Sequence, residues 1–182
     1  MNDSLPFAGA DSGTIQEIIR ESESYLSAQL AASIAADQRA VAFASLLAAA
    51  TAIIAGTGGA LLLGAQVDHG LGWVCIAVAA AFLVAMALAN LSAMPAGFWY
   101  VGNSPKQWLD DIEAKRPLSE SLSQQLAHYD EMIEANDRLM RRNNKQMLWA
   151  MWMAWGALAI GGVVAVALIA IRLYLPNLEI CG

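Results

Sequence analysis

Charged residues and cysteines are scarce in this 182-residue chain, and basic residues are not in excess. Charged side chains make up 14% of the sequence, whereas a soluble globular domain usually carries about 25%. Two cysteines are too few for a secreted disulfide scaffold. A net charge of −6 argues against nucleic acid as a partner. The composition therefore excludes a soluble enzyme, a secreted scaffold and a nucleic-acid-binding domain.

The sequence instead contains long runs without charged residues. About 20 consecutive apolar residues suffice for a helix to cross a bilayer. Three stretches meet this requirement, at residues 40–63, 71–93 and 147–171. We therefore predict an all-α integral membrane protein with three transmembrane helices, surrounded by the lipid bilayer.

The Lys and Arg residues outside these stretches indicate how the chain is threaded. Residues 1–39 hold two, residues 95–146 hold seven, and the part after residue 171 holds one. Because cytoplasmic loops are enriched in Lys and Arg, we expect a multi-pass protein of the bacterial inner membrane with a cytoplasmic N-terminus and a periplasmic C-terminus. Residues 1–36 are acidic and lack the pattern of a cleavable signal peptide, so the first membrane helix is expected to act as an uncleaved signal.

The same reasoning divides the chain into four parts. Residues 1–39 form an N-terminal cytoplasmic amphipathic helix, and residues 40–94 form a transmembrane hairpin of helices one and two. Residues 95–146 form a cytoplasmic connector and a coiled-coil-like helix, and residues 147–182 form the third transmembrane helix with a short outward tail. Tryptophans at the start of that helix are expected to anchor it at the interface rather than line a small-molecule pocket; they are Trp149, Trp152 and Trp155.

Two helices are predicted to run from the cytoplasm into the membrane. Thr14 and Glu17 fit a capping box that would begin the first, over residues 14–39. The second has a coiled-coil seam, with residues at alternating steps of four and three: Leu122, Leu126, Tyr129, Ile133, Asn136, Met140 and Asn143. We expect the two helices to pack in parallel as a cytoplasmic two-helix stalk that extends transmembrane helices one and three. The two seam asparagines either fix the register or are solvated where the seam frays.

Small residues recur at every fourth position along the first membrane helix. The part of this ridge inside the predicted membrane span consists of Ala44, Ala48, Ala52, Gly56 and Ala60. Such spacing lets membrane helices approach closely, because lipid supplies no hydrophobic drive and van der Waals contact must suffice. The ridge is therefore predicted to be a packing surface, either against the chain's own second and third membrane helices or against another copy.

Residues able to perform chemistry are missing or isolated. No ionisable residue lies deep in a membrane stretch, which argues against a proton- or ion-coupled transporter. His128 and Glu131 share a helix face but lack matching ligands elsewhere, so they are interpreted as solvated. We predict no catalytic residue, no metal site and no cofactor, and hence a non-enzymatic protein. Cys75 and Cys181 are either free thiols or, in an oxidising periplasm, disulfide-bonded.

The run Ala-Asp-Gln-Arg-Ala at residues 36–40 leads directly into the Ala-rich first membrane helix. In this and in its general layout the chain resembles the transmembrane effectors of bacterial cyclic-nucleotide (Pycsar-type) defence systems. That resemblance implies membrane disruption after nucleotide sensing, and it assigns no site residue. The residues themselves favour an interaction or structural role, as a homo-oligomer or as an accessory subunit of a larger membrane complex. The alternative is a self-assembling, membrane-permeabilising defence effector.

Overall fold

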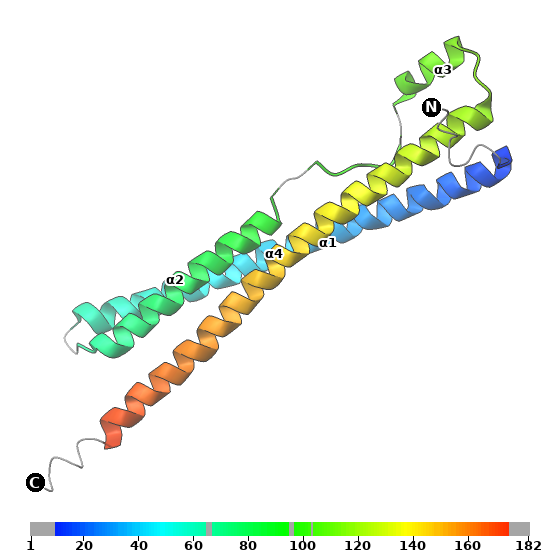
Figure 1. Ribbon diagram of the computed structural model, residues 1–182. Helices are drawn as coiled ribbons and strands as arrows, with labels where there is room; N and C mark the ends of the chain where they lie inside the picture. Colours follow the sequence, from blue (N-terminus) through cyan, green and yellow to red (C-terminus); the bar gives the residue numbers. More distant parts are fainter. Residues whose placement is uncertain (1–9, 65–66, 95–96, 103, 175–182) are drawn as a thin grey trace, which may run out of the picture. The chain divides into compact units, whose positions relative to one another are not determined.

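The computed structural model describes residues 10–64, 67–94, 97–102 and 104–174. Throughout these ranges the regular elements are helices, which confirms the predicted all-α class (Figure 1). In chain order they are α1 (Ser12–Leu63), α2 (His69–Ser92), the short 3-10 helix η1 (Pro105–Trp108), α3 (Leu109–Glu113) and α4 (Leu118–Tyr174). With 52 and 57 residues, α1 and α4 run without interruption through both the polar and the apolar parts of their sequences.

The chain divides into two compact units, which are described separately. The first unit comprises residues 1–36 and 95–142, and the second comprises residues 37–94 and 143–182. The cytoplasmic and membrane parts, with boundaries at residues 39, 94 and 146, stay predictions.

In the first unit, α1 begins at an aspartate and not at the predicted capping box. The Asp11 carboxylate accepts hydrogen bonds from the backbone amides of Gly13 and Thr14, at 2.9 and 3.0 Å, and from the Thr14 hydroxyl at 2.6 Å. Glu17 instead pairs with Arg20, one turn further along the helix. The capping-box prediction was therefore wrong, because Asp11 already satisfies the free amides that begin the helix.

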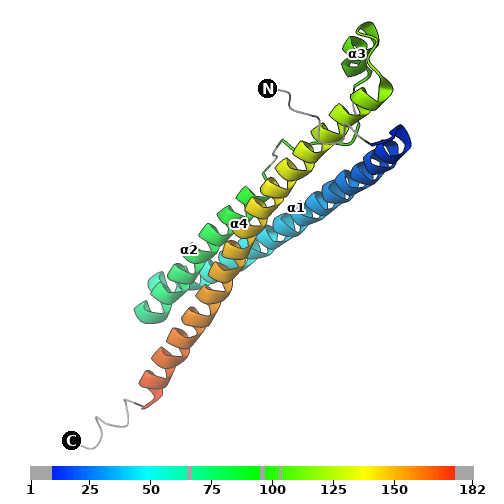
Figure 2. The same cartoon turned by 45° about the vertical axis from the view of Figure 1, so that its right-hand side comes forward.

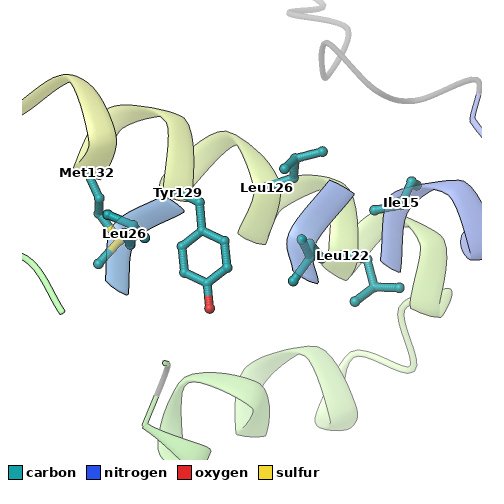
Figure 3. Close-up of a cluster of buried hydrophobic side chains, with 7 residues drawn as sticks. Ile15, Leu26, Leu122, Leu126, Tyr129 and Met132 are labelled. Carbon is teal, nitrogen blue, oxygen red and sulfur yellow. The ribbon is translucent and has the colours of Figure 1, made fainter. Parts of the chain in front are cut away.

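Within the first unit, the N-terminal part of α1 and the first part of α4 run side by side in the same direction in both views (Figures 1 and 2). Large apolar side chains from both helices meet between them (Figure 3). The buried members of this cluster are Ile15, Ile19, Leu26, Leu122, Leu126, Tyr129 and Met132. Burying such side chains stabilises the pair by about 1.5–3 kcal/mol each.

In the second unit, the remainder of α1 forms a hairpin with α2, and the rest of α4 packs on it. Two buried clusters join these helices, one around Phe82 and one around Ala89. The hairpin crosses closely at Gly58 and Gly72: a Cβ at Gly58 would lie 3.0 Å from the Cβ of Cys75, and one at Gly72 would lie 2.7 Å from the Leu62 side chain. A Cβ at Gly161 would collide with Val78, so α4 also approaches α2 through a glycine.

Three helices are long and apolar enough to cross a membrane, namely α1, α2 and α4. In the most apolar stretch of each, only 17%, 22% and 11% of the residues are buried within the chain. Most of this apolar surface therefore faces outward.

Candidate functional site

Asn136 is the centre of a polar network in the first unit, and it links three separate segments of that unit. Its Oδ1 accepts a hydrogen bond from the Trp99 backbone amide at 3.0 Å, and its Nδ2 donates to the Trp99 carbonyl at 3.2 Å. The same Nδ2 lies 3.3 Å from Oε1 of Gln29 on α1. Because the amide side chain matches the donor and acceptor of one backbone residue, it holds the connector against α4 much as a neighbouring strand would.

Gln29 continues this network along α4. Its Nε2 donates to Oδ1 of Asp137 at 2.8 Å, and the Ile133 carbonyl lies 3.4 Å away. Asn136 is 1% exposed and Gln29 is 5% exposed. Buried amides are costly unless their hydrogen bonds are made. This matched set therefore favours one alignment of α1, α4 and the connector over shifted ones.

A second polar contact lies within the apolar cluster of the same unit. The fully buried Tyr129 hydroxyl donates to Oε1 of Glu23 at 2.9 Å and accepts from Nε2 of Gln125 at 3.1 Å. Burial raises the pKa of the Tyr129 phenol, so it remains protonated and able to donate. The Trp99 indole also meets the ring of His128 edge to face, with centroids 6.0 Å apart.

The predicted seam lies largely at this interface. Leu122, Leu126, Tyr129 and Asn136 are buried, whereas Ile133, Met140 and Asn143 are half-buried. The buried, hydrogen-bonded Asn136 is not a solvated residue. At the seam position before Asn136, both Ile133 and its neighbour Met132 pack at the interface, and Met132 is the more deeply buried of the two.

The predicted small-residue ridge does not form one buried face. Ala44 is buried, while Ala48, Ala52, Gly56 and Ala60 are exposed. Four residues turn an α-helix by slightly more than one full turn, about 40° further at each step. A ridge of this spacing therefore winds around α1, and the close approach to α2 falls on Gly58 instead.

An ion pair closes one end of the second unit. The Asp68 carboxylate caps α2 by accepting from the Leu71 amide at 3.0 Å, and it also binds both terminal nitrogens of the Arg172 guanidinium, with Nη2 at 2.7 Å from Oδ1. The Leu71 amide, followed by Arg172, holds the pKa of Asp68 below its ordinary value of 3.8. This pair was not predicted from the sequence; the opposite charges of Asp68, directly before α2, and Arg172, near the end of α4, were the signal that could have found it.

The remaining predicted groups stay apart. His128 Nδ1 lies 3.9 Å from Glu131 on an accessible part of α4, and no three His, Cys, Asp or Glu residues gather as metal ligands within the described ranges. Cys75 is a half-buried free thiol, while Cys181 lies outside the described residues. Trp149, Trp152 and Trp155 are all exposed.

No protein family, curated protein or solved structure shows significant similarity to the chain. The arrangement of neutral amides, one phenol and short-range ion pairs holds helices together.

Proposed function

We propose that the chain is a non-enzymatic multi-pass membrane protein, with α1, α2 and α4 crossing the bilayer in the second unit. The observation that carries this proposal is the outward-facing apolar surface of these three helices, whose most apolar stretches are buried by no more than 22%. Apolar surface of that extent is unfavourable in water. Lipid or another membrane protein must therefore cover it.

The helical pair of the first unit is then a two-helix cytoplasmic stalk, and the C-terminus lies in the periplasm of a bacterial inner membrane. Seven of the ten Lys and Arg residues lie between residues 95 and 146, which supports this orientation. The apolar cluster and the Asn136 network give the pair the fixed alignment that a stalk requires.

Within the membrane we propose an interaction or structural role, as a homo-oligomer or as an accessory subunit of a larger complex. Ala48, Ala52, Gly56 and Ala60 are exposed, and a Cβ at Gly56 would meet nothing within 4 Å. Small exposed residues on a membrane helix allow another helix to approach closely. The same observation favours the second candidate, a defence effector that assembles with itself and permeabilises the membrane.

Native mass spectrometry of the protein, extracted gently from its own membrane, tests these assignments. A discrete multiple of 19.3 kDa is expected for a homo-oligomer, whereas other polypeptides at a fixed ratio would identify an accessory subunit. A strictly monomeric species without partners would contradict both. Dye release from liposomes containing the full chain then separates the candidates, because a structural subunit leaves the vesicles sealed and a permeabilising effector does not.

A further inference from the structure

A stripe of basic residues runs along one face of α4 and continues into exposed tryptophans. Its members are Arg138, Arg141, Arg142, Lys145, Trp149 and Trp152. Residues three, four or seven apart on a helix share a face, and these six follow that spacing within one uninterrupted helix. All six side chains are exposed. We call this set the cation–tryptophan stripe; it belongs to the yellow-to-orange part of α4 in Figure 1.

The charge of the stripe contrasts with that of the chain. Four of the ten Lys and Arg residues fall within eight positions of a chain whose net charge is −6. Beyond Asp137, α4 carries no carboxylate up to its end at Tyr174. The four cations of this segment are therefore followed by no acidic residue in the rest of α4.

Two of the four cations in the stripe form ion pairs with carboxylates, and two do not. Arg138 and Arg141 pair with Glu134 and Asp137 one turn earlier, at 3.1 and 3.4 Å. Both pairs are exposed, so they hold the guanidinium groups only weakly. Arg142 and Lys145 form no ion pair with any side chain in the described ranges.

We propose that the cation–tryptophan stripe binds anionic lipid headgroups, and this rests on the proposed membrane placement of the second unit. Indole rings prefer the headgroup level of a bilayer, and cations directly beside that level attract anionic lipids. Trp149 and Trp152 lie about one and two turns beyond Lys145 on the same face, so the cations stand at the phosphate level and the rings directly beneath it within the interface. A phospholipid with a net negative charge fits this order of cations and indole rings.

The test measures lipid selectivity of the full chain reconstituted in vesicles. Brominated phosphatidylglycerol and brominated phosphatidylcholine quench tryptophan fluorescence where they contact the protein, and their competition gives a relative affinity. We expect the wild type to prefer the anionic lipid by several-fold at low salt. The double variant R142Q/K145Q should lose most of this preference, because each cation beside the surface attracts anionic lipid, and high salt should weaken the wild-type preference.

Two matched variants separate charge at the stripe from charge in general. K106Q/K115Q removes two cations from exposed positions between α2 and α4, and it should retain the wild-type preference. R142K/K145R keeps the charges of the stripe and should also retain it. Unchanged helicity and size-exclusion profiles establish that each variant is folded.

Equal quenching by both lipids in the wild type would overturn the proposal while leaving the membrane placement standing. Equal loss of preference in R142Q/K145Q and K106Q/K115Q would also overturn it, because the selectivity would then come from net charge. Quenching by neither lipid would overturn the membrane placement and this inference together.

Discussion

The two units of the molecule are held together by different kinds of side chain. Among the described residues of the first unit, seven apolar side chains are buried and none of them is alanine: Ile15, Ile19, Leu26, Leu122, Leu126, Tyr129 and Met132. In the second unit seven of nine are alanine, and the set is Ala40, Ala44, Leu47, Ala79, Phe82, Ala85, Ala89, Ala150 and Ala154. One unit is packed with large side chains and the other with small ones.

The surroundings proposed for each unit account for this difference. In water, burying a large apolar side chain removes much surface from solvent and stabilises the fold. In lipid that drive is missing, so helices gain stability from close backbone approach between small residues. The first unit also buries amides and a phenol in hydrogen bonds, as at Asn136 and Tyr129. The buried hydroxyls of the second unit, those of Thr51 and Ser92, bond only to carbonyls of their own helices.

The largest effect is expected from placing a large side chain at a close helix contact of the second unit. Gly72→Leu would push against Leu62 and the Gly58 carbonyl, which is 3.3 Å from the position of an added Cβ. We expect a loss of about 3 kcal/mol in the free energy of unfolding, the upper end for overpacking, because backbone cannot move aside as a side chain can. Denaturant titration in detergent micelles, followed by circular dichroism, measures it.

Gly56→Leu is the matched control, since a Cβ there meets nothing within 4 Å. It should leave the unfolding free energy of the single chain within about 0.5 kcal/mol of the wild type. If copies pack on the exposed ridge, the same variant changes the assembled mass. Equal destabilisation by both substitutions would contradict the hairpin crossing at Gly58 and Gly72.

An intermediate effect is expected in the first unit from Asn136→Ala. The substitution leaves the Trp99 amide, the Trp99 carbonyl and Gln29 without their partner. Because Trp99 is 48% exposed, water replaces part of the loss, and we expect about 1–2 kcal/mol. Hydrogen exchange should increase at the Trp99 amide and along residues 12–36, and it should stay unchanged in α2.

Asn144→Ala removes the same side chain from an exposed position on α4 and should leave stability nearly unchanged. Similar exchange rates in the two alanine variants would show that the Asn136 network does not hold the connector.

Sequence patterns were informative where periodicity alone determines a structure. The seam positions Leu122, Leu126 and Tyr129 are buried because large apolar residues repeat at the spacing of facing helices. The spacing of the ridge did not identify the contact with α2, because which of Gly56, Gly58 and Gly59 faces α2 depends on how the hairpin crosses. The four-residue repeat does not contain that information. Packing of the ridge against another copy stays a prediction.

The polar links were missed for a related reason. The contact between Trp99 and Asn136 depends on the path of a connector that has no repeat, and both of its hydrogen bonds are made with backbone atoms of Trp99. Gln29 carried a weak signal, since it follows Leu26 on the apolar face of α1, where a polar residue calls for a partner. Composition and spacing do not identify that partner.

The smallest effect concerns the Asp68–Arg172 ion pair and depends on pH. The pKa of Asp68 is held below 3.8 by the Leu71 amide and by Arg172. A carboxyl whose pKa is lowered on folding contributes its stability above the unfolded pKa and loses it as the pH falls through the folded value.

The melting temperature of the wild type should therefore decline below about pH 4 by more than that of Asp68→Asn, which keeps a capping side chain and loses the charge. At pH 7 the two proteins should differ only slightly, since the Arg172 side chain is half exposed and solvent screens its charge. Parallel melting curves from pH 7 to pH 3 would show that the ion pair contributes nothing to the joining of α2 and α4, and would leave Gly161 and the apolar clusters as their contacts.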